Sequence, residues 1–219
     1  NGLGFATARM MAAEGAKVVI LDLARAEPQA AAAQLGDGHL GVVADVTDKA
    51  SCEAAAAAIL KAYGRIDILF NNAGITQPRK TLDITGADYD AVMDVSLRGM
   101  LYMSQAVIPA MRAQGGGRII NCSSILGLVG VKWRGAYVAT KFAMEGLTDV
   151  LRIEMRGTGI HAILIEPGPI ATNCWAHAHR PCRSCPLALP ISTLWPSSIA
   201  PSCNNSTDTS PPTSAAMRV

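Results

Sequence analysis

KVVILD, residues 17–22, is a continuous apolar run that follows one lysine and ends on an acidic residue. Runs that are apolar on both faces are typical of strands buried in a parallel sheet. The stretch before it, FATARMMAA (5–13), is rich in strong helix formers and is followed by Gly15, a typical C-terminal stop. A helix that leads directly into a buried strand indicates the α/β class.

The same alternation continues along the chain. Further strands are predicted at HLGVVAD (39–45), IDILFN (66–71), RIINCS (118–123) and IHAILIEP (160–167). Helices are predicted near 26–35, 48–62, 87–112 and 137–156. Strands that alternate with helices of this length form doubly wound parallel sheets, because right-handed crossovers place helices on both faces. The sequence therefore predicts an α/β protein with a doubly wound parallel sheet.

Length and charge exclude several classes of protein. At 219 residues the chain is long enough for one α/β core. Residues 1–172 carry 16 basic and 16 acidic side chains, so they lack the basic surface of a nucleic-acid-binding protein. No apolar run approaches the length of about 18 residues that spans a bilayer. Because only Cys52 and Cys122 lie in this part, we expect reduced thiols, a cytoplasmic protein, and no nucleic-acid or membrane partner.

The composition changes abruptly after Thr172. Residues 173–219 contain seven prolines and eight serines but no glycine or lysine, and they show neither a helical nor a strand period. We predict a folded domain at 1–172 and an irregular tail at 173–219 that is disordered or translated out of frame.

Four tail residues have a spacing similar to that of zinc ligands: His177, His179, Cys182 and Cys185. Closely spaced pairs in a segment without any period are more often accidental than functional. We therefore predict no metal site.

A short glycine-containing stretch, Gly2-Leu3-Gly4, opens the first predicted helix. Glycines there let backbone N–H groups approach a pyrophosphate at the helix N-terminus. Asp22, 18 residues after Gly4 at the end of the next strand, can bind the adenosine ribose hydroxyls. Because a 2′-phosphate would meet this carboxylate, the sequence favours NAD over NADP, and Arg25 makes that preference moderate.

Four further features occur in a fixed order. NNAG (71–74) follows one predicted strand and Ser124 follows the next, and then Tyr137 and Lys141 form a YxxxK motif 13 residues after Ser124. This set resembles the short-chain dehydrogenase/reductase family from Gly2 to Thr172. The resemblance implies a Rossmann-like oxidoreductase that transfers a hydride between NAD(P) and an alcohol or ketone carbon. It also implies a small-molecule substrate and a homo-oligomer, a tetramer or dimer, formed through the two long helices.

The tyrosine and lysine suit the chemistry of ketone reduction. A free tyrosine has a pKa of about 10 and is a poor base near neutrality. A cation one helical turn away, as Lys141 is from Tyr137, stabilises tyrosinate and lowers that pKa. Proton transfer then becomes feasible at neutral pH. By resemblance, Ser124 holds the substrate oxygen against Tyr137, and Lys141 also binds the nicotinamide ribose.

The resemblance implies further cofactor contacts. Asp45 and Val46 resemble the pair that holds the adenine, with a helix N-cap region as the alternative. The stretch from Pro167 to Thr172 resembles the family segment that flanks the nicotinamide, and Thr172 would lie near the carboxamide. The remaining cofactor-binding positions are Asn72, Ala73, Gly74, Gly168 and Ile170.

Two departures from the family pattern stand out. An asparagine that holds a water in the proton relay usually occupies the position of Ser96, so we place Ser96 in the catalytic set and expect slower turnover than in Ser96→Asn. The family fold also has a first strand before Gly2, and a lid helix and last strand after Thr172. We therefore expect a partial gene product with a frame-shifted end, whose sheet lacks the first and last strands.

Two alternative functions remain open from the sequence. One is a dinucleotide-binding protein without catalysis, because the relay asparagine is replaced. The other is an epimerase or dehalogenase on the same fold, which an intact Ser/Tyr/Lys set does not exclude. The sequence does not identify the substrate.

Overall fold

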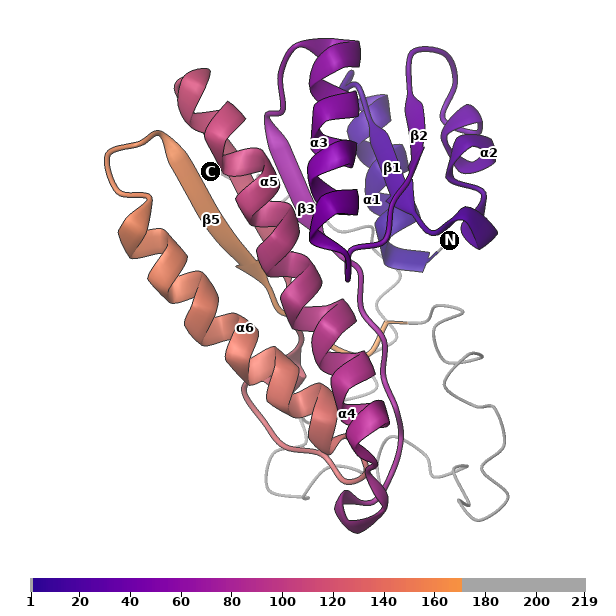
Figure 1. The fold of residues 1–219 in the computed structure, drawn as a ribbon, viewed down its shortest axis with the longest axis vertical. Helices are drawn as coiled ribbons and strands as arrows, with labels where there is room; N and C mark the ends of the chain where they lie inside the picture. Colours follow the sequence, from indigo (N-terminus) through magenta and orange to yellow (C-terminus); the bar gives the residue numbers. More distant parts are fainter. Residues whose placement is uncertain (1, 171–219) are drawn as a thin grey trace, which may run out of the picture. The chain divides into compact units, whose positions relative to one another are not determined.

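The computed structural model describes residues 2–170, which belong to one compact unit (Figure 1). The strands in this range are β1 (Val19–Asp22), β2 (Leu40–Val43), β3 (Ile68–Asn71), β4 (Gly117–Cys122) and β5 (Ile160–Ile165). The α-helices are α1 (Gly2–Ala13), α2 (Pro28–Ala33), α3 (Lys49–Tyr63), α4 (Gly86–Met93), α5 (Gly99–Ala113) and α6 (Gly135–Glu154). Short helical turns are η1 (Ala24–Ala26), η2 (Thr81–Asp83) and η4 (Ile125–Gly127), and η3 (Asp94–Arg98) is a π-helix.

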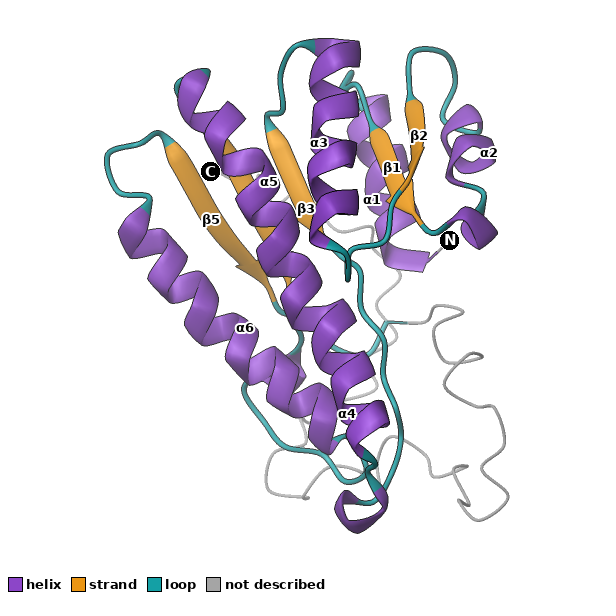
Figure 2. Ribbon diagram, viewed as in Figure 1, coloured by secondary structure: helices purple, strands orange, loops and turns teal. Residues whose placement is uncertain are grey.

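All strand pairs in this range are parallel, and they form two ladders (Figure 2). One ladder joins β1 to β2, and the other has the order β3-β4-β5. The predicted parallel α/β arrangement is therefore confirmed, although the sheet consists of two ladders. Their separation lies between β1 and β3, where the resemblance places a strand that precedes Gly2.

Helices lie on both faces of the strands (Figure 1). Figure 1 shows α3, α5 and α6 in front of the strands and α1 behind them. Helix α3 packs against α5, and α6 packs against β5. No helix within residues 2–170 has the length and apolarity needed to span a membrane.

The core forms where the apolar strands meet the helices in front of them. Leu69, Ile119 and Ala162 occupy matching positions on β3, β4 and β5, and all three are buried. Met111 and Val107 from α5 join the same cluster. The continuous apolar runs in the sequence thus supply strands that bury their side chains between two layers.

Helix ends follow the local signals closely. The Asp48 side chain accepts a hydrogen bond from Ala50 N at the start of α3, and Gly64, with φ of 75°, ends this helix. The helix predicted at 87–112 differs, because the π-helix η3 interrupts it between α4 and α5.

Candidate active site

The predicted site residues follow the carboxyl ends of parallel strands. Asp22 ends β1, and Asn72, Ser124 and Pro167 come shortly after β3, β4 and β5. Ligands of open α/β sheets bind at this edge. The loops after β4 and β5 are joined here, since Ile125 N donates to Pro167 O at 3.2 Å. The structure therefore brings Ser124 and Pro167 close together.

Helix α6 places Tyr137 and Lys141 one turn apart. The Lys141 side chain is buried, with 4% of its surface exposed, and its Nζ donates to the carbonyl oxygen of Cys122 at 2.7 Å. The same Nζ lies 5.4 Å from the centroid of the Tyr137 ring. The end of β4 thus fixes the ammonium beside the tyrosine.

Burial is the main influence on the pKa of Lys141. It lowers the pKa of the ammonium from its ordinary value, while Cys122 and Glu145 act in the opposite direction. Burial also raises the pKa of the Cys122 thiol, which Lys141 partly offsets. The thiol therefore stays protonated near neutrality.

Ser124 stands at the turn between β4 and η4. Its side chain is largely buried, and its Oγ accepts a hydrogen bond from Leu126 N at 3.1 Å as the cap of η4. A serine hydroxyl has one donor in addition to its acceptor sites. The cap therefore holds Ser124 in place and leaves its O–H able to donate to a ligand oxygen.

Two predicted nucleotide-binding residues meet at the start of α1. An ideal Cβ on Gly4 would lie 2.6 Å from Nδ2 of Asn72, so a side chain at position 4 would displace the Asn72 amide. Gly2 adopts φ of 70°, and the space beside it is open. Helix α1 therefore presents its first turn, with glycine backbone, next to the segment that follows β3.

Asp22 ends β1, Asp45 follows the neighbouring β2 by two residues, and both side chains are exposed. Asp22 Oδ1 accepts from Leu23 N at 2.8 Å. Asp45 Oδ1 accepts from the N and Oγ1 of Thr47, which lowers the pKa of Asp45, and Arg25 lowers it further. Arg25 thus acts on Asp45, and the Asp45 carboxylate also stabilises its own turn.

Val46 turns its side chain toward the core. An ideal Cβ on Gly99, the first residue of α5, would lie 2.8 Å from Cγ2 of Val46. Val46 also packs against the main apolar cluster. This side chain therefore anchors the loop to α5, and the loop can meet a ligand through Asp45 and its backbone.

The other predicted cofactor positions lie on exposed loops. Ala73, Gly74, Gly168 and Ile170 are all exposed. The Cβ position of Gly74 has only ordinary contacts, 3.6 Å from Ser96 Oγ, so no tight internal contact requires glycine there. Thr172 and the four zinc-like tail residues lie outside the described part of the chain. In residues 2–170, no group of three or more His, Cys, Asp or Glu side chains could hold a metal ion.

Ser96 sits in the π-helix and is completely buried. Its Oγ accepts from Ile75 N at 3.3 Å and lies 3.4 Å from Ile75 O, to which it can donate. A π-helix within a helical segment often marks a functional site. Here it turns Ser96 toward the loop after NNAG, so the hydroxyl fixes that loop.

The structure contains a buried polar network that was not predicted from the sequence. Asn71 Nδ2 donates to Asn121 Oδ1 at 2.9 Å and to Ser104 Oγ at 3.3 Å, and Asn121 Nδ2 donates to Thr148 Oγ1 at 2.9 Å. The network ties β3 and β4 to α5 and α6. The available signal was the asparagine near the end of each of these two strands.

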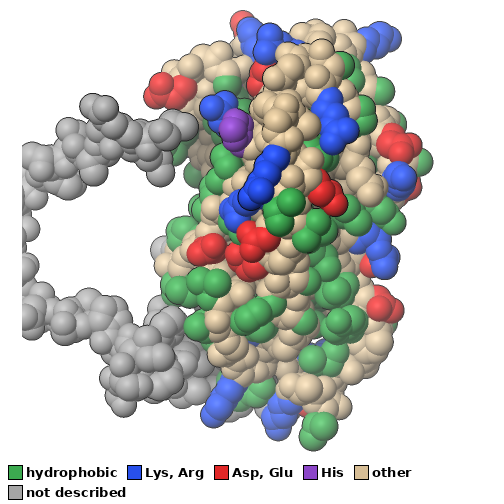
Figure 3. Space-filling view, turned by 90° about the vertical axis from the view of Figure 1, so that its left-hand side faces the viewer, with side chains coloured by type: hydrophobic (Ala, Val, Ile, Leu, Met, Phe, Trp, Pro, Cys, Tyr) green, Lys and Arg blue, Asp and Glu red, His purple; other side chains and the backbone are tan. Residues whose placement is uncertain are grey.

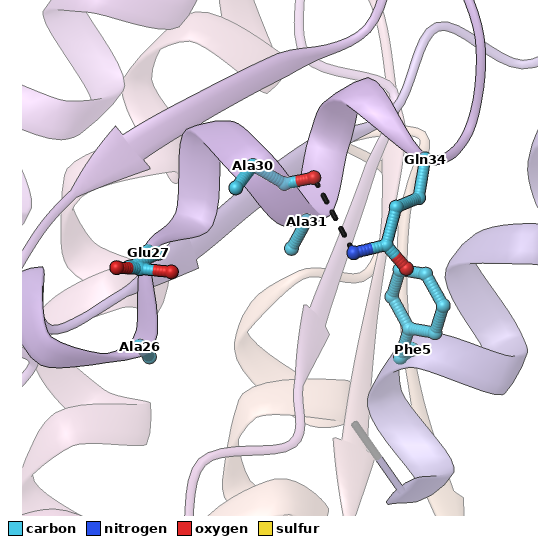
Figure 4. A pocket seen from close by; sticks show the side chains of 6 residues that line it. All are labelled: Phe5, Ala26, Glu27, Ala30, Ala31 and Gln34. Atoms are coloured by element: carbon cyan, nitrogen blue, oxygen red, sulfur yellow. Dashed lines mark hydrogen bonds between the residues drawn. The ribbon is translucent and has the colours of Figure 1, made fainter.

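A surface cavity of about 250 Å³ lies elsewhere, between α1 and α2 (Figure 4). Its lining includes Phe5, Glu27 and Gln34, and Gln34 Nε2 donates to Ala30 O within its own helix. None of the predicted site residues lines it. The candidate site is therefore the strand-end cluster around Ser124, Tyr137 and Lys141.

Comparison with known proteins agrees with this geometry. The family model described as short chain dehydrogenase matches residues 1–182. An uncharacterized short-chain type dehydrogenase/reductase of Sinorhizobium fredii is 42% identical over 179 residues, covering 79% of this chain and 71% of the relative. D-threitol dehydrogenase of Mycolicibacterium smegmatis is 37% identical, covering 79% and 68%. The 3-alpha-(or 20-beta)-hydroxysteroid dehydrogenase of Mycobacterium bovis is 40% identical, covering 78% and 66%.

The matched region thus spans roughly two thirds of the length of these relatives. It contains every strand and helix described above, together with the Ser124, Tyr137 and Lys141 cluster. The chain belongs to the short-chain dehydrogenase/reductase family of NAD(P)-dependent oxidoreductases.

Proposed function

We propose that this chain oxidises a secondary alcohol, or reduces the matching ketone, with Tyr137 as the acid/base group and NAD as the cofactor. The observation that carries the proposal is the buried Lys141 ammonium, which Cys122 O holds 5.4 Å from the Tyr137 ring centroid. A fixed cation at this distance stabilises the tyrosinate that alcohol oxidation requires.

Each residue of the cluster has a part in the reaction. The Ser124 hydroxyl donates to the substrate oxygen and orients it. In oxidation, tyrosinate Oη of Tyr137 takes the proton from the alcohol oxygen, and in reduction the phenol returns it. Lys141 balances the negative charge that this phenol carries between the two steps. A bound nicotinamide supplies the acceptor or donor of the hydride.

The chain has groups suited to hold that cofactor. An ammonium has three N–H donors, and the bond to Cys122 O occupies one of them, so Lys141 can also bind ribose hydroxyls. The first turn of α1 offers backbone N–H groups to a pyrophosphate beside Asn72. Asp22 is exposed at the end of β1, which supports our assignment of this carboxylate to the adenosine ribose hydroxyls.

The NAD preference rests on Asp22. We expect Asp22→Ser to raise the KM for NAD by about 10–100-fold, because a charged hydrogen bond contributes about 1.5–3 kcal/mol. The KM for NADP should fall, since the carboxylate no longer opposes a 2′-phosphate. Steady-state rates with both cofactors measure the change, and Asp37→Ser, at an exposed turn, is the matched control. An unchanged ratio of the two KM values would show that Asp22 does not set the preference.

Ser96 offers a test of the proton relay. Because its hydroxyl contacts the Ile75 backbone, we propose that it supports the relay less well than an asparagine amide would. We expect Ser96→Asn to raise kcat by up to about tenfold. Thermal unfolding of the same variant reports any cost of fitting the larger side chain. An unchanged kcat in a folded variant would contradict the relay argument at this position.

The substrate is a small-molecule alcohol or carbonyl compound. The relatives include a threitol dehydrogenase and a hydroxysteroid dehydrogenase, whose names indicate a polyol and a steroid alcohol. We propose that the substrate of this chain, like the compounds named for these relatives, carries a secondary alcohol. Incubating the protein with NAD and a panel of polyols, cyclic alcohols and steroid alcohols, while following absorbance of the reduced nicotinamide, tests the function. Absence of turnover with every member of the panel would count against it.

We also propose a cytoplasmic homo-oligomer. Helix α6 exposes Phe142, Val150 and Ile153 along its outer side, and an exposed apolar stripe of this kind favours burial against another chain. Figure 3, which views the molecule from the side of α6 and β5, shows hydrophobic side chains gathered in the lower half of this face. The buried Cys52 and Cys122 are free thiols, as expected in a reducing compartment.

A further inference from the structure

The two residues that lead into α6, Trp133 and Arg134, include one with an unusual backbone conformation. Trp133 adopts φ of 64°, in the left-handed region that bulky side chains rarely occupy. Such a conformation persists only where neighbouring contacts impose it, and these strained residues are concentrated at functional sites. Tyr137, the proposed acid/base group, lies four residues further on, in the first turn of α6. The contacts that impose the conformation therefore lie close in the chain to this tyrosine.

Two hydrogen bonds tie this segment to the loop that follows β3. Arg79 N donates to the carbonyl oxygen of Trp133 at 3.0 Å, next to a parallel bridge between Arg79 and Arg134. The Arg134 guanidinium donates through Nη1 to Thr76 Oγ1 at 2.9 Å, and both residues are half-buried. We call these two bonds the clasp. The clasp joins residues that are 58 positions apart in the chain, as Thr76 and Arg134 are.

The loop at the other end of the clasp is itself held in place. The Asp88 carboxylate on α4 pairs with Arg79 Nε at 2.8 Å, and only 13% of the Asp88 side chain is exposed. Ile75 N donates to the buried Ser96 Oγ in η3 at 3.3 Å. This loop continues directly from the NNAG motif. The clasp thus connects the segment assigned to the cofactor with the start of α6.

The start of α6 depends on such contacts because its own sequence provides no cap. The N-cap residue is Arg134, whose side chain has only donors, so it cannot accept from the free N–H groups of the first turn. Gly135 follows, and an ideal Cβ there would lie 3.4 Å from Ile84 Cδ1 and 3.7 Å from Thr81 Oγ1. The first residue of α6 therefore packs against the end of the same loop. The direction in which α6 begins is set by these contacts, which include the clasp.

We propose that Arg134 is a positioning residue, which through its bond to Thr76 holds the first turn of α6 so that the Tyr137 hydroxyl meets the substrate oxygen beside the nicotinamide. This role rests on the proposed dehydrogenase function, since it acts through Tyr137. In this role Arg134 touches neither substrate nor cofactor. Misplacing a reacting group by about 1 Å can slow a reaction about 10²-fold. Loss of the clasp therefore slows proton transfer more than it weakens the binding of either ligand.

Thr76→Val in the full-length protein with NAD tests the proposal, because valine keeps the branched shape and lacks the hydroxyl that accepts from Arg134. We expect kcat for alcohol oxidation to fall about tenfold. The KM for NAD should stay within about twofold of the wild type, because Asp22 and the first turn of α1 are unchanged. The solvent deuterium isotope effect on kcat should increase, since proton transfer to Tyr137 becomes slower relative to the other steps. A smaller folded fraction would lower the rate without changing the isotope effect.

Further variants make the result specific to this bond. Arg134→Met removes the donor and should lower kcat to a similar extent, and the double variant should lose no more than either single variant. Thr76→Ser restores a hydroxyl and should recover most of kcat. Thr158→Val is the matched control, because Thr158 Oγ1 donates to Met155 O at 2.7 Å just beyond the other end of α6. It should leave both kcat and the isotope effect unchanged.

Thermal unfolding identifies the folded variants, and Thr76→Ala replaces Thr76→Val if the valine does not fit. Wild-type kcat in the folded Thr76 and Arg134 variants overturns the proposal, as does a lower kcat with an unchanged isotope effect. Losses that multiply in the double variant also overturn it, since they show that the two residues act separately. Retained turnover in Tyr137→Phe would instead overturn the proposed function itself.

Discussion

Tyr137→Phe is expected to lower turnover by about 10²–10⁴-fold, the contribution typical of one acid/base group. The phenylalanine ring retains the packing of Tyr137 above Lys141 Nζ, so only the titrating hydroxyl is lost. Without it, the proposed mechanism has no group to take the proton from the alcohol oxygen. Absorbance of the reduced nicotinamide, followed in the full-length protein with excess NAD and alcohol, measures the loss.

The control for this variant is Tyr89→Phe. Tyr89 lies on α4, is 41% exposed, and is not among the predicted site residues. Its loss of a hydroxyl should leave turnover unchanged. Cofactor affinity of Tyr137→Phe, measured by fluorescence titration, should remain close to that of the wild type. Full turnover in Tyr137→Phe would refute the acid/base assignment.

Lys141→Met is expected to lower kcat/KM by at least about 100-fold while changing the free energy of unfolding by less than about 2 kcal/mol. The activity falls because tyrosinate loses its fixed cation and the cofactor loses a ribose ligand. Two opposing effects keep the stability change small. Losing the bond to Cys122 O leaves a carbonyl unpaired, whereas removing a buried charge relieves its desolvation.

The desolvation of buried Lys141 should also be visible in the pH dependence of stability. Burial lowers the pKa of Lys141 in the folded state, so the unfolded state binds more protons between the folded and unfolded pKa values. Folding therefore carries a penalty at neutral pH, and this penalty is relieved as pH rises through the folded pKa toward the unfolded one. In Lys141→Met the penalty is absent, so this alkaline gain in stability should disappear.

Urea unfolding at neutral and alkaline pH measures both quantities for Lys141→Met. Lys61→Met is the matched control, since Lys61 is an exposed lysine in the last turn of α3. It should change neither turnover nor the pH dependence of stability. A large loss of stability in Lys141→Met, with activity lost in proportion, would show that the lysine is mainly structural.

Much of the site follows from local sequence. The interval of four residues between Tyr137 and Lys141 ensures that they are neighbours on any helix. Gly64 adopts the left-handed conformation that glycine favours, and it ends α3 as predicted. Ser124 lies at a strand end because the strand predicted at RIINCS (118–123) stops one residue before it. These features depend on residues close together in the chain, so a single sequence suffices to predict them.

Contacts between distant segments were not predictable in this way. The π-helix that turns Ser96 toward Ile75 breaks a segment whose sequence predicts one continuous helix. The bond between Asn71 and Asn121 depends on β3 lying next to β4 in a particular register. In the sequence, Ser96 looks like any polar residue in a helix, and the two asparagines look like any polar residues in a strand.

The sequence by itself determined the order of strands and helices, the α/β class and the chemistry that Tyr137 and Lys141 offer, because periodicity and short spacings act within one element. Only the tertiary structure decided that Lys141 is buried against Cys122 O, that Val46 faces α5, and that Arg134 bonds Thr76 in the loop after β3. These outcomes depend on how layers pack, since burial and hydrogen-bond pairing arise between elements far apart in the chain.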